Sequence, residues 1–500
     1  MEKNSRFFGI LMPVSSLPSP HGIGTLGKAA YDFVDFLSAS KAKVWQMLPL
    51  NVTSYGDSPY QSPSSKGLNY YFIDLDILVE KKLLTEEEVE NADFGDDIAH
   101  VNYGKLFENR IPLLKKAFSR FQTADPDFQK FLFQCPFLDF AFFMTLKEEN
   151  GYKAWYEWPE DVKNYHKEIR ERVLKEDKDT FLFYLWTQYE FLNEYKALKE
   201  YANSKGILLM GDMPLYLAYD SAEAYLHPQL FLFDKEHVPT LVAGCPPDSF
   251  SQDGQLWGNP IYNWKYQKQT NYEWFNDRIA FNLSLFDLLR IDHFRGFAGY
   301  YVIPFGMRNA RIGRWVPGPG FDFFRDKVKM PIIAEDLGFL DKPVHDLINA
   351  TGYPGMKVLQ FAFDGNSQNE FKPSNSEVNY ICFTGTHDND TTLGYLISLN
   401  EEDRETLKKD VKKECDKFLV PYKDGKLKEL ASTIVELCLA GITKGAIVPI
   451  QDMLLKDGTC RMNTPSLLSP KNWVYRVKPG ELTGTLADKT GRLVEKYNRG

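Results

Sequence analysis

The stretch LRIDHFRGF, Leu289 to Phe297, is the segment around which we expect the fold to be built. Its apolar start is typical of the end of a buried strand, yet the segment contains Arg290, Asp292 and Arg295. Burying a charged side chain costs free energy unless the charge is paired or has a function. In an extended chain, Arg290 and Asp292 lie on one face. The guanidinium should hold that carboxylate ionised near neutral pH, so Asp292 is suited to act as a nucleophile. A structural ion pair is the alternative.

The overall charge disfavours two classes of partner. The chain has 500 residues, a net charge of −9 and a pI near 5.6, so neither nucleic acid nor an anionic membrane would be attracted over its whole surface. Aromatic residues make up 15% of the sequence, and such rings serve as stacking floors for sugars as well as in ordinary cores. A neutral small molecule or a sugar is compatible with both observations.

The cysteines and the N-terminal segment point to a reduced, cytoplasmic protein. The cysteines show no CxxC pair and no histidine at metal-binding spacing, so we expect no structural zinc and no metal site. Prolines interrupt the apolar start of the chain, which has neither a secretory pattern nor a span of transmembrane length. The cysteines are Cys135, Cys245, Cys382, Cys415, Cys438 and Cys460.

A glycine-rich segment near the N-terminus imitates two nucleotide-binding motifs. Gly22, Gly24 and Gly27 satisfy G-x-G-x-x-G, and the same segment nearly satisfies the P-loop. Both motifs fail on context, because prolines separate the glycines from the preceding strand and Ala29 stands where the P-loop needs a hydroxyl. We therefore predict no nucleotide cofactor.

Apolar segments alternate with helical patterns along most of the chain. This alternation is typical of a parallel sheet, and about eight strands predict an α/β fold of the (β/α)8 TIM-barrel class. Helices are expected at 181–205, 272–286, 322–329 and 343–350, and over 401–440. The expected strands are residues 7–14, 43–50, 207–216, 288–292, 331–335, 356–363, 380–384 and 446–451.

Two insertions are expected in this barrel. Residues 1–75 would start the barrel, 76–179 would form a large helical insertion subdomain, and 180–500 would complete the barrel with a loop insertion at 217–271. The first insertion contains a helix-start signal of the capping-box type at Thr85 to Glu88 and an amphipathic segment from Leu106 to Phe121. The stretch Ala243 to Trp264, rich in Pro, Gly and Asn, is expected to be a long active-site loop.

Acidic residues recur where apolar strands end, at Asp212, Asp292, Glu335 and Asp388. In a parallel barrel these ends meet at one rim. Cleavage of a glycosidic bond needs one carboxyl to protonate the leaving oxygen and a second to attack or stabilise the sugar carbon. Asp292 suits the second role, and Glu335, on an apolar strand, suits the first because desolvation would raise its pKa.

Each of the later acids also has a structural alternative. Glu335 and Asp336 could cap a helix. His387 to Asp390 could form a calcium loop or a solvated turn, although the spacing excludes an EF-hand. Four acids at the ends of strands together favour a sugar site.

The sequence resembles the amylomaltase family, the 4-α-glucanotransferases or disproportionating enzymes of glycoside hydrolase family seventy-seven, relatives of the α-amylases. The resemblance extends from SSLPSPHGIG near the start to NWVYRV at Asn472 to Val477. The motifs that carry it are LRIDHFRGF, IAEDLG, GYPGMKVLQFAFD, THDN and GQLWGNPIYNW. It implies that Asp292 is the nucleophile, Glu335 the general acid/base and Asp388 the transition-state stabiliser.

The same resemblance implies a set of substrate-binding residues around the three catalytic ones. Arg290 and His387 would line the subsite of the cleaved sugar, Tyr60 would border it, and Asp212 belongs to the first α-amylase-type region. Asp248 and Trp257 would lie in a loop over the acceptor subsites, faced by Asn463 in a second loop. That second loop departs from the family pattern, since Ser466 follows Pro465 where glycine is usual, and we expect its path to change.

The implied activity is transfer of α-1,4-glucan segments between maltooligosaccharides by a retaining double displacement, without a cofactor. Such a reaction predicts that the carboxyls of Asp292 and Glu335 lie about 5–5.5 Å apart. Two alternatives remain open. An α-glucan hydrolase would use the same three carboxylates, and a non-catalytic glucan-binding protein would keep only the aromatic cleft.

Overall fold

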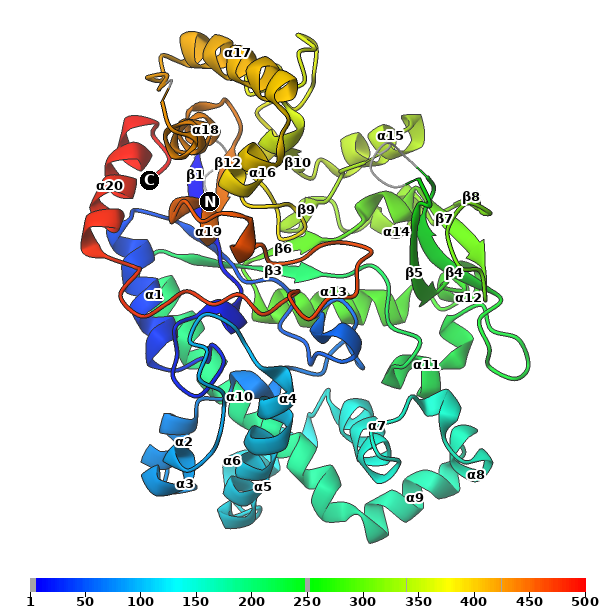
Figure 1. Ribbon diagram of the computed structural model, residues 1–500. Coiled ribbons are helices and arrows are strands. Elements are labelled where there is room, and N and C mark those ends of the chain that lie inside the picture. Colours follow the sequence, from blue (N-terminus) through cyan, green and yellow to red (C-terminus); the bar gives the residue numbers. More distant parts are fainter. Residues whose placement is uncertain (1–5, 248–251, 339, 424) are drawn as a thin grey trace.

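A parallel barrel of eight strands forms the centre of the molecule (Figure 1). The computed structural model describes residues 6–247, 252–338, 340–423 and 425–500. The strand order is β10-β11-β12-β1-β2-β3-β6-β9, and the Ala334 N–H donates to the Pro354 carbonyl at 2.9 Å where β9 meets β10. The predicted (β/α)8 fold is confirmed. The strands are β1 Phe7–Leu11, β2 Val44–Gln46, β3 Leu208–Met213, β6 Leu288–Ile291, β9 Ile332–Ala334, β10 Gly355–Val358, β11 Tyr380–Phe383 and β12 Gly445–Pro449.

Each predicted strand is present, but all are shorter than expected, two of them by half or more. The predicted strand 43–50 is regular only over β2, and the chain then turns through Pro49. The predicted strand 356–363 ends with β10, after which Leu359–Phe361 forms a 3-10 turn. All residues of β1 and β12 are buried, as expected for parallel strands covered on both faces.

Helices surround the barrel, and most lie where the sequence predicts them. The exception is the predicted helix 322–329, which is wrong beyond its first turn because only α14, Phe321–Phe324, is helical. No helix in the described part of the chain is long and apolar enough to cross a membrane. The other helices of the barrel and its C-terminal part are α1 Lys28–Ala39, α10 Lys178–Ser204, α13 Glu273–Leu285, α15 Lys342–Thr351, α16 Thr392–Ser398, α17 Glu401–Phe418, α18 Leu427–Ala440, α19 Ile450–Met453 and α20 Gly484–Lys496.

Short helices between β2 and α10 gather below the barrel in Figure 1. The predicted capping box is confirmed: Thr85 Oγ1 accepts the Glu88 N–H at 3.2 Å, and Glu88 Oε2 accepts the Thr85 N–H at 3.0 Å. The domain boundaries at 75/76 and 179/180 stay predictions. These helices are α2 Leu75–Glu80, α3 Glu86–Glu90, α4 Tyr103–Lys105, α5 Ile111–Arg120, α6 Pro126–Phe133, α7 Leu138–Glu149, α8 Glu160–Lys163 and α9 Lys167–Glu176.

A second, antiparallel sheet lies beside the barrel, at the right of Figure 1, and was not predicted. Its order is β5-β4-β7-β8, with β4 Leu241–Cys245, β5 Gln255–Pro260, β7 Gly299–Pro304 and β8 Arg314–Pro317. The expectation of an irregular loop over residues 243–264 is therefore wrong in part, because β4 and β5 pair within it. The helices α11 Ala222–Leu226 and α12 Trp264–Gln269 flank these two strands in sequence.

The glycine-rich segment near the N-terminus serves close packing. A Cβ on Gly24 would lie 1.8 Å from the Val14 carbonyl oxygen, so no larger residue fits at this position. A Cβ on Gly27, which precedes α1, would lie 2.1 Å from Asp74 Oδ2. Carboxylate and carbonyl oxygens at these glycines are unsuited to a phosphate, in agreement with the rejection of the nucleotide motifs.

Candidate active site

The structure brings the ends of β3, β6 and β9 together at one rim of the barrel. Asp212 pairs with Arg290 in the register of β3 and β6, and Ile291 pairs with Ala334 in that of β6 and β9. The next hydrogen bonds continue this register, because the Asp292 N–H donates to the Met213 carbonyl at 3.0 Å and the Glu335 N–H donates to the Ile291 carbonyl at 3.1 Å. Asp292 and Glu335 are therefore neighbours across adjacent strand ends.

Arg290 links two carboxylates of this rim. Its Nη1 lies 2.6 Å from Asp212 Oδ2, and its Nη2 lies 3.0 Å from Asp292 Oδ1. The Arg290 side chain is 4% exposed and that of Asp212 is fully buried, whereas Asp292 is 30% exposed. The guanidinium thus fixes the orientation of Asp292 while leaving part of that carboxylate open to solvent or substrate.

Burial outweighs the arginine in setting the acidity of Asp292. Desolvation, the largest cause, raises the pKa of Asp292 to about 6; Arg290 lowers it, and Asp212 opposes Arg290. The sequence predicted that Arg290 would hold this carboxylate ionised near neutral pH, and the arginine does lower the pKa, although less than burial raises it. Asp292 still ionises below neutral pH, as attack on a sugar carbon requires.

Glu335 is held by two backbone amides. Its Oε2 accepts the His293 N–H at 2.7 Å, and its Oε1 accepts the Leu337 N–H at 2.8 Å. Burial raises the pKa of Glu335 to about 7, against the lowering effects of Arg290 and these two amides, while Asp292 raises it further. Helix capping is not its role, because Asp341 caps α15 by accepting the Val344 N–H. Glu335 therefore keeps its proton to higher pH than Asp292, the order that an acid beside a nucleophile needs.

Asp388 follows β11 and is oriented by a second loop. Its Oδ1 accepts a hydrogen bond from Asn463 Nδ2 at 2.7 Å and lies 3.4 Å from His387 Nε2. Arg461 fixes the backbone, since its Nη2 donates to the Asp388 carbonyl at 2.6 Å. The side chain is 46% exposed, so its carboxylate keeps an oxygen for a ligand.

Tyr60 connects the loop after β2 to this rim. Its hydroxyl lies 3.0 Å from Asp212 Oδ2 and 3.4 Å from His387 Nδ1. The Tyr60 ring stacks on the His387 imidazole with centroids 4.8 Å apart and an angle of 19° between the rings, and Trp473 packs at 5.7 Å from both. These rings form an aromatic wall next to the carboxylates.

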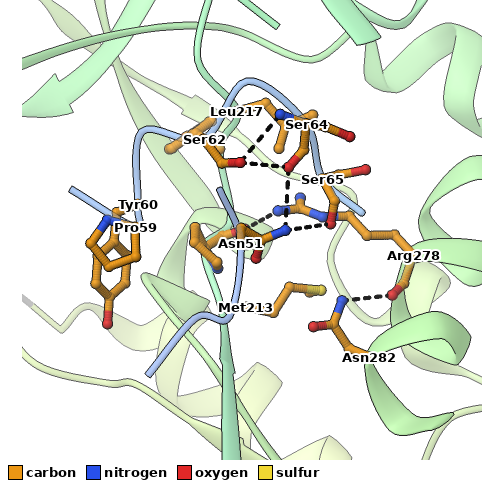
Figure 2. A pocket seen from close by; sticks show the side chains of 12 residues that line it. Asn51, Pro59, Tyr60, Ser62, Ser64, Ser65, Met213, Leu217, Arg278 and Asn282 are labelled. Carbon is orange, nitrogen blue, oxygen red and sulfur yellow. Dashed lines mark hydrogen bonds between the residues drawn. The ribbon is translucent and has the colours of Figure 1, made fainter. Parts of the chain in front are cut away.

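A small pocket behind Tyr60 shows how its loop is held (Figure 2). Asn51 Nδ2 donates to the carbonyls of Ser64 and Ser65 at 3.2 and 3.1 Å, and the Ser62 hydroxyl donates to the Ser64 carbonyl at 2.8 Å. Among the proposed site residues, only Tyr60 lines this pocket. These hydrogen bonds therefore hold the loop in place, and the pocket is not itself the candidate site.

Trp257 lies on β5 and brings the second sheet to the rim. It contacts the His293 ring at 4.8 Å between centroids and Tyr216 at 6.2 Å. Its Nε1 donates to Gln255 Oε1 at 3.0 Å. Asp248, predicted to share this region, lies outside the described residues.

Ser466 adopts the backbone conformation that glycine would supply. Its φ is 62°, in the left-handed region, so the serine accepts the strain of that conformation. Asn463 reaches Asp388 in this structure, and a change of the loop's path relative to the family stays a prediction.

A side-chain hydrogen bond holds the loop after β11. Asn389 Oδ1 accepts the Thr386 N–H at 2.9 Å, which closes a turn. In the described ranges, no group of three or more His, Cys, Asp or Glu side chains is arranged to hold a metal ion.

Comparison with known proteins places the chain in an established family. A family model described as 4-α-glucanotransferase matches residues 12–483. The chain belongs to the 4-α-glucanotransferase family. The 4-α-glucanotransferase of Clostridium butyricum is 42% identical over 98% of this chain and 100% of its own length. That of Streptococcus pneumoniae is also 42% identical, over 98% of this chain and 97% of the relative.

Solved structures agree with this family assignment. The amylomaltase from Streptococcus agalactiae in complex with acarbose superposes with a TM-score of 0.93 at 37% identity, covering 99% of this chain and 100% of that one. The amylomaltase from Corynebacterium glutamicum, at 18% identity, has a TM-score of 0.77 and covers 99% of this chain and 74% of that one, which supports the fold alone.

Two residues that complete the rim of this 4-α-glucanotransferase family member were not predicted. Trp473, which packs on Tyr60 and His387, lies in the NWVYRV motif that supported the resemblance, so its neighbourhood was a usable signal. Arg461, which holds the Asp388 backbone, carries no local signal because its contact spans 73 residues of sequence.

Proposed function

We propose that this chain transfers α-1,4-glucan segments between maltooligosaccharides by a retaining double displacement. One observation carries the proposal: Asp292, paired with Arg290, and Glu335, whose pKa is higher, follow adjacent strands of the barrel. The N–H of His293, the residue after Asp292, donates to the Glu335 carboxyl. Family membership supplies the substrate class, because the relatives are named 4-α-glucanotransferases.

The first step forms a glycosyl–enzyme ester. A carboxylate oxygen of Asp292 bonds to the anomeric carbon as the glycosidic bond breaks, and the bonding electrons move to the leaving oxygen. Glu335 gives its proton to that oxygen, and the shortened glucan leaves. Arg290, held by Asp212, keeps Asp292 aligned for this attack.

The second step releases the enzyme. The 4-hydroxyl of an acceptor glucan gives its proton to the Glu335 carboxylate and attacks the anomeric carbon, and the ester bond to Asp292 breaks. Asp388 and His387 would bind hydroxyls of the sugar at the cleaved bond, where the positive charge of the transition state develops. Tyr60 would stack on the same sugar.

The products from maltotriose separate transfer from hydrolysis. We expect incubation with maltotriose alone to give glucose together with a ladder of longer maltooligosaccharides, because an acceptor hydroxyl should resolve the ester faster than water does. Chromatography of the products over time is the measurement. Only shorter products would establish the hydrolase, and glucan binding without turnover would establish the binding protein.

The pH dependence of transfer should follow the ionisation of Asp292 and Glu335. Asp292 must be ionised and Glu335 protonated in the first step, so we expect a bell-shaped profile of kcat/KM with limbs near pH 6 and pH 7. Activity falls at lower pH as Asp292 gains a proton, and at higher pH as Glu335 loses one. Initial rates with maltotriose from pH 4 to 9 test this order, and a profile flat across pH 5–8 would contradict it.

The partners and location of the enzyme complete the proposal. Maltooligosaccharides and longer α-1,4-glucans are the proposed substrates, and no cofactor takes part in either step. The reduced-cysteine pattern supports a cytoplasmic location.

A further inference from the structure

The loop that carries His387 and Asp388 has buried ends and an open middle. It begins at Thr384, the residue after β11, and ends at Thr392, the first residue of α16. The two threonines are 0% and 1% exposed, whereas the Asp388 side chain between them is 46% exposed. The position of the Asp388 carboxylate therefore depends on how the two ends of the loop are held.

One carboxylate, that of Asp452, accepts hydrogen bonds from both ends of this loop. Its Oδ2 accepts the hydroxyl of Thr384 at 2.6 Å and that of Thr392 at 2.7 Å, and its Oδ1 accepts the Thr392 N–H at 2.6 Å. All three distances are at the short end of the range for hydrogen bonds in proteins. Asp452 thus ties the end of β11 to the start of α16 across the base of the loop.

Asp452 is itself buried, which makes a carboxylate at this position costly. It lies in α19, after β12, and is 2% exposed. Burial raises the pKa of Asp452, and the hydrogen bonds from Thr384 and Thr392 oppose this shift. Because burying a carboxylate costs free energy unless donors satisfy it, the donors of the loop explain how this side chain is tolerated in the interior.

The residue before Asp452 holds the second loop. Gln451 Nε2 donates to the Cys460 carbonyl at 3.3 Å. Arg461, the residue after Cys460, donates to the Asp388 carbonyl at 2.6 Å. Two adjacent residues after β12 therefore hold the two loops that meet at Asp388.

We propose that Asp452 is a positioning residue, which holds Asp388, and His387 with it, in the place that stabilisation of the transition state requires. This inference rests on the proposed function and deepens it. Asp452 does not meet the sugar, because it is buried below the ends of the loop. It acts through Asp388, and misplacing a catalytic group by about 1 Å costs about 10²-fold in rate.

Two variants loosen the base of the loop to different degrees. Asp452→Ala removes all three hydrogen bonds, whereas Thr384→Val removes one of them and keeps the shape of the side chain. With maltotriose, we expect kcat to fall about 30- to 100-fold in Asp452→Ala and about five- to tenfold in Thr384→Val. The KM should stay within about threefold of the parent in both, because Asp388 acts mainly on the transition state.

Two further variants separate positioning from a general loss of packing. Asp452→Asn keeps an oxygen for the Thr392 N–H, and its NH₂ group can donate to the two hydroxyls, so kcat should stay within about threefold of the parent. Thr145→Val makes the same change as Thr384→Val in α7, where Thr145 is 2% exposed and donates to the Ala141 carbonyl at 2.7 Å. Its kcat should equal that of the parent. A loss with Asn as large as that with Ala would overturn the inference.

Coupling to Asp388 is the decisive readout. With α-maltosyl fluoride as donor, the rate of the first equivalent of fluoride reports ester formation. Asp452→Ala should lower this rate about 30-fold or more in the parent but by no more than about fivefold in an Asp388→Ala background, where only His387 still depends on the loop. Thr384→Val in the same two backgrounds repeats the test with the buried carboxylate in place. Equal losses in both backgrounds, or a lower melting temperature with parental kcat, would overturn the inference.

Failure of this inference is distinguishable from failure of the proposed function. If the parent makes no ladder from maltotriose, the transferase assignment fails, yet fluoride release still measures the effect of Asp452. If the parent makes the ladder and the losses are independent of Asp388, only the positioning role is refuted.

Discussion

Replacing Asp292 by Asn should lower glucan transfer by at least about 10⁴-fold, because removal of a catalytic nucleophile abolishes the covalent route. Asn keeps the shape of the side chain and can still accept from Arg290, which retains its contact with Asp212 at 2.6 Å. We therefore expect the fold and the melting temperature to change little. Initial rates with maltotriose, on protein shown by mass spectrometry to be free of deamidation, provide the measurement.

Asp277→Asn is the matched control for this variant. It makes the same chemical change on α13 at an exposed carboxylate paired with Lys66, and its activity should equal that of the parent. Asp292→Asn activity within tenfold of the parent would remove Asp292 as the nucleophile.

Replacing Glu335 by Ala should lower transfer from maltotriose by about 10³-fold or more, because neither the leaving oxygen nor the acceptor hydroxyl then has a proton partner. The same variant should release the first equivalent of fluoride from α-maltosyl fluoride, the burst that accompanies ester formation, at a rate close to that of the parent, since fluoride leaves without protonation. Alanine is preferred to Gln, whose NH₂ would face one of the two amide donors, His293 N–H or Leu337 N–H. The comparison of the two donors separates loss of an acid from general damage.

Equal losses with both donors would contradict the acid/base role. They would indicate that Glu335 maintains the rim structurally, through the two amides that it accepts.

The barrel was predictable because its strands have a simple signature. Short apolar runs such as Ile332–Ala334 are buried on both faces, and they are separated by helices long enough to show a period, such as α10. The carboxylates were predictable for the same reason, since Asp292 and Glu335 follow the last apolar residue of their strands. The closed topology then determines which strand ends meet.

The second sheet was not predictable from the same signals. Strand β5 lies in a segment rich in Gly and Pro, and β8 is largely exposed, so neither shows the alternation or the apolar run of a buried strand. Strand β4, LVAGC, is a short apolar run, but it is too brief and too close to Gly and Pro to predict a strand by itself. Its stability comes from pairing with β7, which lies far away in sequence. The wall that carries Trp257 therefore depends on tertiary contacts.

The electrostatics of the rim also lay beyond sequence reasoning. The pair Arg290 and Asp292 predicted an ionised carboxylate, but the sequence did not reveal that Asp212 shares the arginine on a neighbouring strand. Burial raises both pKa values, and the two backbone amides on Glu335 come from the turns after two different strands. Such effects depend on distances that only the folded chain defines.

Mass spectrometry of a trapped intermediate tests the central claim most directly. Glu335→Ala incubated with α-maltosyl fluoride forms the ester but lacks the base that would activate an acceptor, so the ester should accumulate. The expected result is a proteolytic peptide that carries one maltosyl group on Asp292. A maltosyl group on another residue, or no covalent adduct while fluoride is released, would contradict a double displacement through Asp292.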